Sequence, residues 1–132
     1  MLVEPLLVNI SATRKSLCRD YTIYACNYKI ILHEGATTDG DSVPKIFQWI
    51  LNTPWYYKCI PAAIVHDNLY ENHTLPRYIC DRIYYHLNLV NGYDPTKAFV
   101  KYASLRCFGW LRYKQGRKHQ RDKIVVRDLS KN

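Results

Sequence analysis

The sequence has no long apolar run, no closely spaced cysteine pair, and few glycines and prolines. A membrane-spanning helix needs roughly 20 consecutive apolar residues, and no run here approaches that length. Five Gly and six Pro in 132 residues exclude collagen-like and linker-like chains. What is present is a hydrophobic fraction of 48% and an aromatic fraction of 14%, led by twelve Tyr. This composition predicts a single domain with its own hydrophobic core.

The five cysteines are odd in number and scattered along the chain. Structural zinc sites use close pairs of cysteines, so no such site is expected. We expect reduced and mostly buried thiols in a cytosolic protein. Because Glu4 and Pro5 interrupt the short apolar stretch at the amino terminus, no cleavable signal peptide is expected either.

Positive charge is concentrated in the last third of the chain. Residues 1–96 hold eight Lys/Arg and nine Asp/Glu, whereas residues 97–132 hold eleven Lys/Arg and two Asp/Glu. Such a segment can contact nucleic acid, an acidic protein surface or anionic lipid, although a solvated basic face that aids solubility explains it equally. The cations predicted to bind a partner are Arg112, Lys114, Arg117, Lys118, Arg121 and Lys123.

The residue pattern predicts an α+β fold, with a small antiparallel sheet packed against about three helices and followed by a basic C-terminal tail. Strands are predicted within residues 19–33, at 2–10 and at 124–126. Helices are predicted at residues 60–71, 75–91 and 94–113, with a shorter amphipathic turn or helix at 45–51. We expect one globular domain over residues 1–114 and the tail over residues 115–132.

The first two of these long helices carry a histidine and an aspartate that we expect to meet. His66 lies five residues before Glu71, and Asp81 lies five residues after Pro76. In an antiparallel pair each would therefore lie about 7–8 Å from the connecting turn. A hydrogen bond between them would fix the imidazole tautomer and make the other ring nitrogen a general base. A packed core histidine, and an ion pair between Asp81 and Arg77, are the alternatives.

Acidic residues near this pair are candidate metal ligands. Asp67 follows His66 directly, and Asp39 and Asp41 belong to a glycine-bearing loop. Oxygen ligands favour Ca²⁺, with Mg²⁺ as the second choice, over Zn²⁺. A Lewis acid beside an activated water is an arrangement that supports hydrolysis. A simple turn at Asp39 and a cap or bend at Ser42 are the alternatives.

The order of motifs resembles a small phage and prophage family of unknown function. The motifs are T-D-G-D-S-V-P at residues 38–44, P-A-A-I-V-H-D-N-L-Y at 61–70, an acidic residue in the next helix and F-G-W at 108–110. The resemblance spans roughly Gly35 to Trp110, and Asp41 stands where that family usually has a small residue. It implies a phage or prophage origin, and hence the cytoplasm of an infected host or the virion, but no established activity.

The H-D-N-L-Y segment also resembles the active-site helix of calcium-dependent phospholipases that use a His–Asp dyad. This resemblance implies that His66 is the base and that Asp81, on the antiparallel helix, orients it. Tyr70 follows on the same helix and completes the catalytic group, although a core aromatic explains it equally. The implied Ca²⁺ ligands are Asp67, Asp39 and the carbonyl oxygen of Gly40.

Three hypotheses of function follow. The leading hypothesis is a metal-dependent hydrolase that cleaves phospholipid esters, with the basic tail on an anionic lipid surface. The alternative is a non-catalytic phage protein, either a virion component or a host-directed inhibitor, whose His–Asp cluster is structural and whose tail docks on a partner. A nucleic-acid module is the third option, because Trp110 and Tyr113 alternate with cations that could neutralise phosphates.

Overall fold

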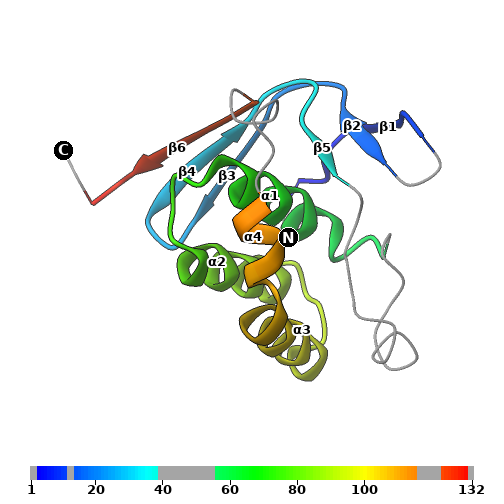
Figure 1. Ribbon diagram of the computed structural model, residues 1–132. Coiled ribbons are helices and arrows are strands. Elements are labelled where there is room, and N and C mark those ends of the chain that lie inside the picture. Colours follow the sequence, from blue (N-terminus) through cyan, green and yellow to red (C-terminus); the bar gives the residue numbers. More distant parts are fainter. Residues whose placement is uncertain (1–2, 12–13, 39–55, 116–122, 131–132) are drawn as a thin grey trace.

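The computed structural model describes residues 3–11, 14–38, 56–115 and 123–130, with residues 111, 114 and 115 described by their backbone alone. Within these ranges the chain forms two three-stranded antiparallel sheets and four helices (Figure 1). The strands are β1 (Leu7–Asn9), β2 (Lys15–Leu17), β3 (Tyr21–Ala25), β4 (Tyr28–Leu32), β5 (Thr37–Thr38) and β6 (Ile124–Asp128). The helices are α1 (Ile60–Asn72), α2 (Arg77–Val90), α3 (Pro95–Phe108) and α4 (Trp110–Gln115). The α+β class is therefore confirmed.

The region predicted to hold one or two strands forms the β3–β4 hairpin. Its turn residues, Cys26 and Asn27, have φ angles of 51° and 67°, the left-handed conformation that tight two-residue hairpins require. Along β3 the side chains of Tyr21, Ile23 and Ala25 are buried and those between them are exposed. This alternation places one face of the hairpin on the core, as the sequence predicts.

The last strand comes from the segment predicted as a basic tail. β6 pairs antiparallel with β4, with Ile124 opposite Leu32 and Val126 opposite Ile30. The strand predicted at residues 124–126 is confirmed and continues to Asp128. The carboxyl-terminal part of the chain therefore completes the sheet in the order β3-β4-β6.

α1 is the central helix of the core. Every residue from Pro61 to Tyr70 is buried, and the helix contacts α2, α4 and strands of both sheets. Residues 73–76 connect it to α2, which begins at Arg77 because Pro76 has an extended backbone and forms the N-cap. The helices lie together on one side of the sheets (Figure 1), so that α1 lies between the strands and the other helices. The helix predicted at residues 45–51 lies outside the described residues.

The single helix predicted over residues 94–113 is divided in two. α3 begins after Asp94, whose side chain accepts a 2.9 Å hydrogen bond from the backbone N–H of Lys97, as expected of an N-cap. It ends at Phe108, and α4 starts at Trp110 after the intervening Gly109. Glycine is a poor helix former, which favours an end to α3 at this position.

All five cysteines lie within the described residues, and all are free thiols in the structure. The expectation that most of them are buried is wrong, because only Cys59 and Cys80 are. The other three are exposed: Cys18 directly follows β2, Cys26 lies in the turn of the β3–β4 hairpin, and Cys107 lies in the last turn of α3. Among the described helices, none has the length and apolar character required to cross a membrane.

Candidate functional site

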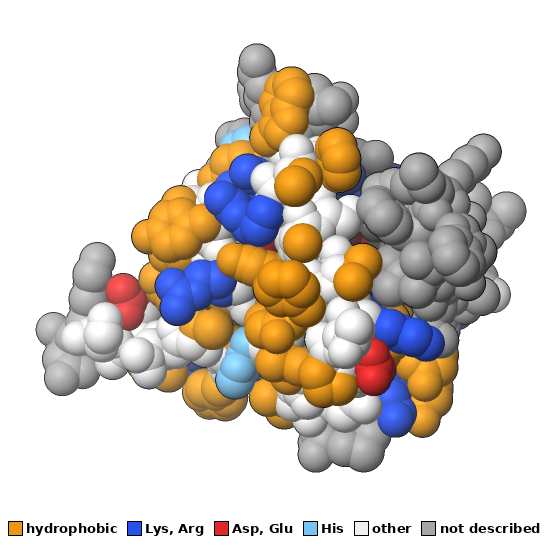
Figure 2. Space-filling view, turned by 90° about the horizontal axis from the view of Figure 1, so that it is seen from below, with side chains coloured by type: hydrophobic (Ala, Val, Ile, Leu, Met, Phe, Trp, Pro, Cys, Tyr) orange, Lys and Arg blue, Asp and Glu red, His pale blue; other side chains and the backbone are white. Residues whose placement is uncertain are grey.

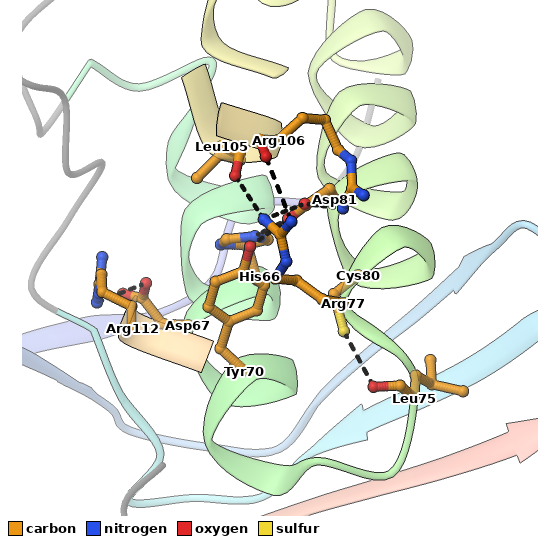
Figure 3. Close-up of polar contacts among 10 residues, drawn as sticks. All are labelled: His66, Asp67, Tyr70, Leu75, Arg77, Cys80, Asp81, Leu105, Arg106 and Arg112. Carbon is orange, nitrogen blue, oxygen red and sulfur yellow. Dashed lines mark hydrogen bonds and ion pairs between the residues drawn. The ribbon is translucent and has the colours of Figure 1, made fainter. Parts of the chain in front are cut away.

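α1 and α2 bring His66 and Asp81 together in the core (Figure 3). Nε2 of His66 lies 2.9 Å from Oδ1 of Asp81, and the two side chains are 5% and 0% exposed. The imidazole also packs against the rings of Tyr70 and Tyr84, with centroid separations of 4.0 and 5.0 Å. The hydrogen bond predicted from the helix spacing is therefore present, while the catalytic roles of these residues remain predictions.

Asp81 determines how the imidazole is oriented. An ionised carboxylate can only accept hydrogen bonds, so Nε2 of His66 carries the proton and donates it. The hydroxyl of Tyr70 donates to the same oxygen. Burial by itself would raise the pKa of Asp81, but the hydrogen bond and charge of His66, together with hydrogen bonds from Tyr70 and Arg106, lower that pKa below its usual value. Asp81 is therefore ionised at neutral pH.

Tyr70 acts in this cluster as a donor. Burial, followed by the hydrogen bond to Asp81 and the negative charge of Asp81, raises the pKa of the Tyr70 hydroxyl above its ordinary value. The hydroxyl therefore stays protonated and holds the carboxylate in place. Cys80, the neighbour of Asp81 on α2, has its pKa raised to about 12 by burial and by the charge of Asp81, so it remains a neutral thiol.

Two arginines reach the second oxygen of Asp81. Nη1 of Arg106 lies 2.9 Å from Oδ2, and Nη1 of Arg77 lies 3.7 Å from it. Arg77 also donates to the carbonyl oxygens of Leu105 and Arg106, at 2.8 and 3.3 Å, and so joins α2 to the last turn of α3. The contact between Arg106 and Asp81 could not be predicted from the sequence, because the two residues lie 25 positions apart on different helices and no local spacing connects them.

Gly109 sets how closely the α3–α4 junction approaches this cluster. A Cβ atom at position 109 would lie 2.6 Å from the hydroxyl oxygen of Tyr70 and 2.6 Å from the carbonyl oxygen of Leu105. Both separations are shorter than carbon–oxygen contacts allow, so only glycine fits without a shift of its neighbours. This packing explains why the F-G-W motif has glycine at its centre. The flanking Phe108 and Trp110 are exposed.

Gly109→Ala is expected to lower the free energy of unfolding by about 1–3 kcal/mol, because the added methyl group overpacks the contact with Tyr70. The change would be measured by urea denaturation. Ser104→Ala, elsewhere on α3, is the control and should stay within about 0.5 kcal/mol of the wild type. A Gly109→Ala protein as stable as the wild type would show that the junction does not depend on this close approach.

Asp67, next to His66 on α1, faces the beginning of the T-D-G-D-S-V-P motif. Its Oδ2 accepts a 2.7 Å hydrogen bond from the hydroxyl of Thr38, the last residue of β5. Its Oδ1 lies 3.3 Å from Nη2 of Arg112. The side chain of Asn68 donates to the carbonyl oxygen of Thr37 at 3.1 Å. Two side chains of α1 therefore hold β5 beside the dyad.

The predicted metal ligands are only partly described. Asp39, Gly40 and Asp41, together with Ser42 of the loop motif, lie outside the described residues. Among the residues that the structure does describe, no group of three or more His, Cys, Asp or Glu could hold a metal ion. Asp67 is thus the member of the predicted ligand set whose position is known, and a guanidinium balances its charge in this arrangement.

Of the six predicted partner-binding cations, Arg112 and Lys123 lie within the residues whose side chains the structure describes. Arg112 lies at the candidate site, against Asp67. Lys123 lies directly before β6, where its carbonyl oxygen accepts a 2.7 Å hydrogen bond from the backbone N–H of His33. The remaining positions are outside the described part: the side chain of Lys114, and residues Arg117, Lys118 and Arg121.

The lowered pKa of Asp81 predicts how stability depends on pH. The unfolded chain should bind this proton near a pKa of about 3.9, and the folded protein only at a lower pH. The stabilisation is therefore complete above that value and is lost as the pH falls through the folded pKa. Urea denaturation should show the difference in unfolding free energy between wild type and Asp81→Asn shrinking below about pH 4. A difference that stays constant from pH 6 to pH 2 would contradict the assignment.

The fold and the site together define an α+β protein whose two core helices share a buried His–Asp–Tyr cluster held by arginines. The chain belongs to the family described as protein of unknown function (DUF1353), whose model matches residues 16–105. The resemblance seen in the sequence spans roughly Gly35 to Trp110. The family match begins earlier than that, and it ends before the F-G-W motif.

The uncharacterised protein y4iH of Sinorhizobium fredii (strain NBRC 101917 / NGR234) is similar to this chain, with 31% identity over 72 residues. These residues cover 54% of the present chain and 30% of the relative. The chain thus spans less than a third of the relative it matches. No solved structure matches the chain.

Proposed function

We propose that this protein is a hydrolase in which His66 activates water. The observation that carries the proposal is the 2.9 Å contact between Nε2 of His66 and the buried carboxylate of Asp81. Because Nε2 donates to Asp81, the atom that accepts a proton from water is Nδ1. The carboxylate then stabilises the imidazolium that forms, and the proton passes from the imidazole to the leaving oxygen as the ester bond breaks.

Asp81 and Tyr70 are positioning residues in this proposal. The carboxylate keeps the imidazole in one tautomer and one orientation, and the hydroxyl of Tyr70 holds the carboxylate from the opposite helix. Arg106 occupies the other carboxylate oxygen, so Asp81 has a donor on each oxygen and little freedom to rotate. A base held this way is already aligned before the substrate binds, which is how enzymes reduce the cost of reorganisation.

The substrate class we propose is an ester of a phospholipid. The resemblance of the H-D-N-L-Y helix to calcium-dependent phospholipases supports this choice, as does the excess of positive charge in residues 97–132. The phage or prophage origin implied by the motif order, and the corresponding location in an infected cell or a virion, belong to the same proposal.

Calcium is the cofactor we propose. The fit rests on the hydrogen bond between the Thr38 hydroxyl and Asp67, because Asp39, the other acidic ligand expected from the sequence, follows Thr38 directly in the chain. Held by Asp67 and Asp39, Ca²⁺ would supply a Lewis acid that stabilises negative charge on the substrate oxygen. Calorimetry should detect Ca²⁺ binding that Asp67→Asn abolishes.

Release of fatty acid from vesicles is the experiment that tests the function. The full-length protein would be incubated with phosphatidylglycerol vesicles in the presence of Ca²⁺, and then with a chelator. Hydrolysis that depends on the protein would support the proposal. Intact lipid under all conditions, together with no calorimetric signal for Ca²⁺ or Mg²⁺, would overturn it.

The burial of the dyad favours a second candidate. His66 is only 5% exposed, and Asp81 is fully buried among three kinds of donor, which also suits a hydrogen-bond network that stabilises the core. In that case the protein would be a non-catalytic phage protein that binds a protein or nucleic acid through its basic segment. Substitution of His66 would then change stability and leave partner binding intact.

A further inference from the structure

The charges at the candidate site are arranged with acids inside and guanidinium groups outside. The side chains of Asp81 and Asp67 are 0% and 8% exposed, whereas those of Arg106 and Arg112 are 36% and 43% exposed. Arg77 adds a third guanidinium beside Asp81. Three cations therefore surround two carboxylates, and the side of the cluster that solvent reaches is positive.

Arg106 and Arg112 approach the dyad from different elements. Arg106, on α3, contacts Asp81, and Arg112, on α4, contacts Asp67, the residue next to His66. In Figure 3 the two arginines appear at opposite sides of the imidazole. Gly109, between the two helices, is the point at which this part of the chain passes close to Tyr70.

Arg106 has the capacity to bind a further group. A guanidinium has five N–H donors in a planar fork that matches the oxygens of a phosphate. Its hydrogen bond to Asp81 occupies one Nη1 donor. With 36% of the side chain exposed, other donors of the fork can reach a bound anion.

We propose that Arg106 forms an anion-binding subsite and that the substrate therefore carries a phosphate group near the bond that is cleaved. This inference rests on the proposed hydrolase, and it specifies what that enzyme recognises. The phosphate would lie against the exposed guanidinium group of Arg106, while the ester carbon faces His66. A neutral ester without phosphate would lack these contacts and bind weakly.

Direct binding tests the subsite without relying on activity. Inorganic phosphate would be titrated into the full-length protein by calorimetry, with Arg106→Gln compared with Arg82→Gln, which removes the same charge from an exposed position on α2. Arg106→Gln should weaken binding about tenfold or more, the value of one lost charged hydrogen bond, and Arg82→Gln should leave it within about twofold. Equal affinities in the two variants would overturn the subsite.

Arg106→Lys separates a loss of binding from a loss of stability, since it keeps a cation beside Asp81. It should retain the wild-type melting temperature and still bind phosphate several times more weakly, because an ammonium group cannot form the planar fork. If Arg106→Lys binds phosphate as tightly as the wild type, recognition by the fork is wrong.

The source of the phosphate is distinguished by a vesicle arm. Vesicles of phosphatidylglycerol and vesicles of phosphatidylcholine doped with phosphate-free diacylglycerol would be compared with inorganic phosphate. Arg106-dependent binding to phospholipid alone supports a lipid headgroup, and Arg106-dependent binding to inorganic phosphate as well supports a free phosphate ester.

The two proposals fail in different ways. Hydrolysis of phosphatidylglycerol at the same rate by wild type and Arg106→Gln would remove the subsite and leave the hydrolase. Arg106-dependent phosphate binding without any hydrolysis would leave the anion site and remove the hydrolase.

Discussion

Asp81→Asn is expected to lower the free energy of unfolding by about 3–5 kcal/mol, the usual cost of removing one partner from a buried ion pair. The amide keeps the shape of the side chain, but it carries no charge to balance Arg106 and Arg77. Its one acceptor oxygen can serve either His66 and Tyr70 or Arg106, and its NH₂ group then faces donors on the other side. Urea denaturation with a linear extrapolation would measure the change.

Asp20→Asn is the matched control for this substitution. Asp20 also accepts a hydrogen bond from a histidine, His33, at 3.3 Å, but both side chains are substantially exposed. Exposed ion pairs contribute little, so this control should change the unfolding free energy by less than about 1 kcal/mol. If the two variants proved equally stable, the buried cluster would not be a significant source of stability.

His66→Gln is expected to reduce ester hydrolysis by about 10²–10⁴-fold, the range that general base catalysis contributes. Glutamine keeps an N–H group that can donate to Asp81, so the fold should persist while the proton acceptor is lost. Initial rates of fatty-acid release at saturating vesicle concentration would measure the effect, with the melting temperature recorded in parallel.

His86→Gln controls for the loss of a histidine, because His86 is exposed on the same helix as Asp81. Its hydrolysis rate should match that of the wild type. A His66→Gln protein that retains full activity would assign the hydrolysis to other residues. A His66→Gln protein that unfolds while the wild type shows no hydrolysis would favour the structural role of the cluster.

The local parts of the fold could be predicted from the sequence. The β3–β4 hairpin follows from the alternation of buried and exposed residues in β3, and the start of α3 follows from Asp94 followed by Pro95. The end of α3 could not be placed, because glycine is only a moderate helix breaker and a continuous helix through Gly109 fits the same apolar pattern.

The dyad was within reach of sequence reasoning because its members lie 15 residues apart on two helices joined by a short connection. Counting from that connection puts His66 and Asp81 at the same height, whatever the rest of the chain does. The sequence by itself therefore determined the class of fold, the hairpin of α1 and α2, and the meeting of the imidazole with the carboxylate.

The tertiary structure decided everything that surrounds the dyad. Arg106 reaches Asp81 across 25 residues, Thr38 reaches Asp67 across 29, and Arg112 reaches Asp67 across 45. Contacts at such separations depend on how whole helices and strands pack, and helical or strand periodicity carries no information about them. The burial of the His–Asp pair, and the guanidinium groups of Arg77, Arg106 and Arg112 around the two carboxylates, follow from that packing alone.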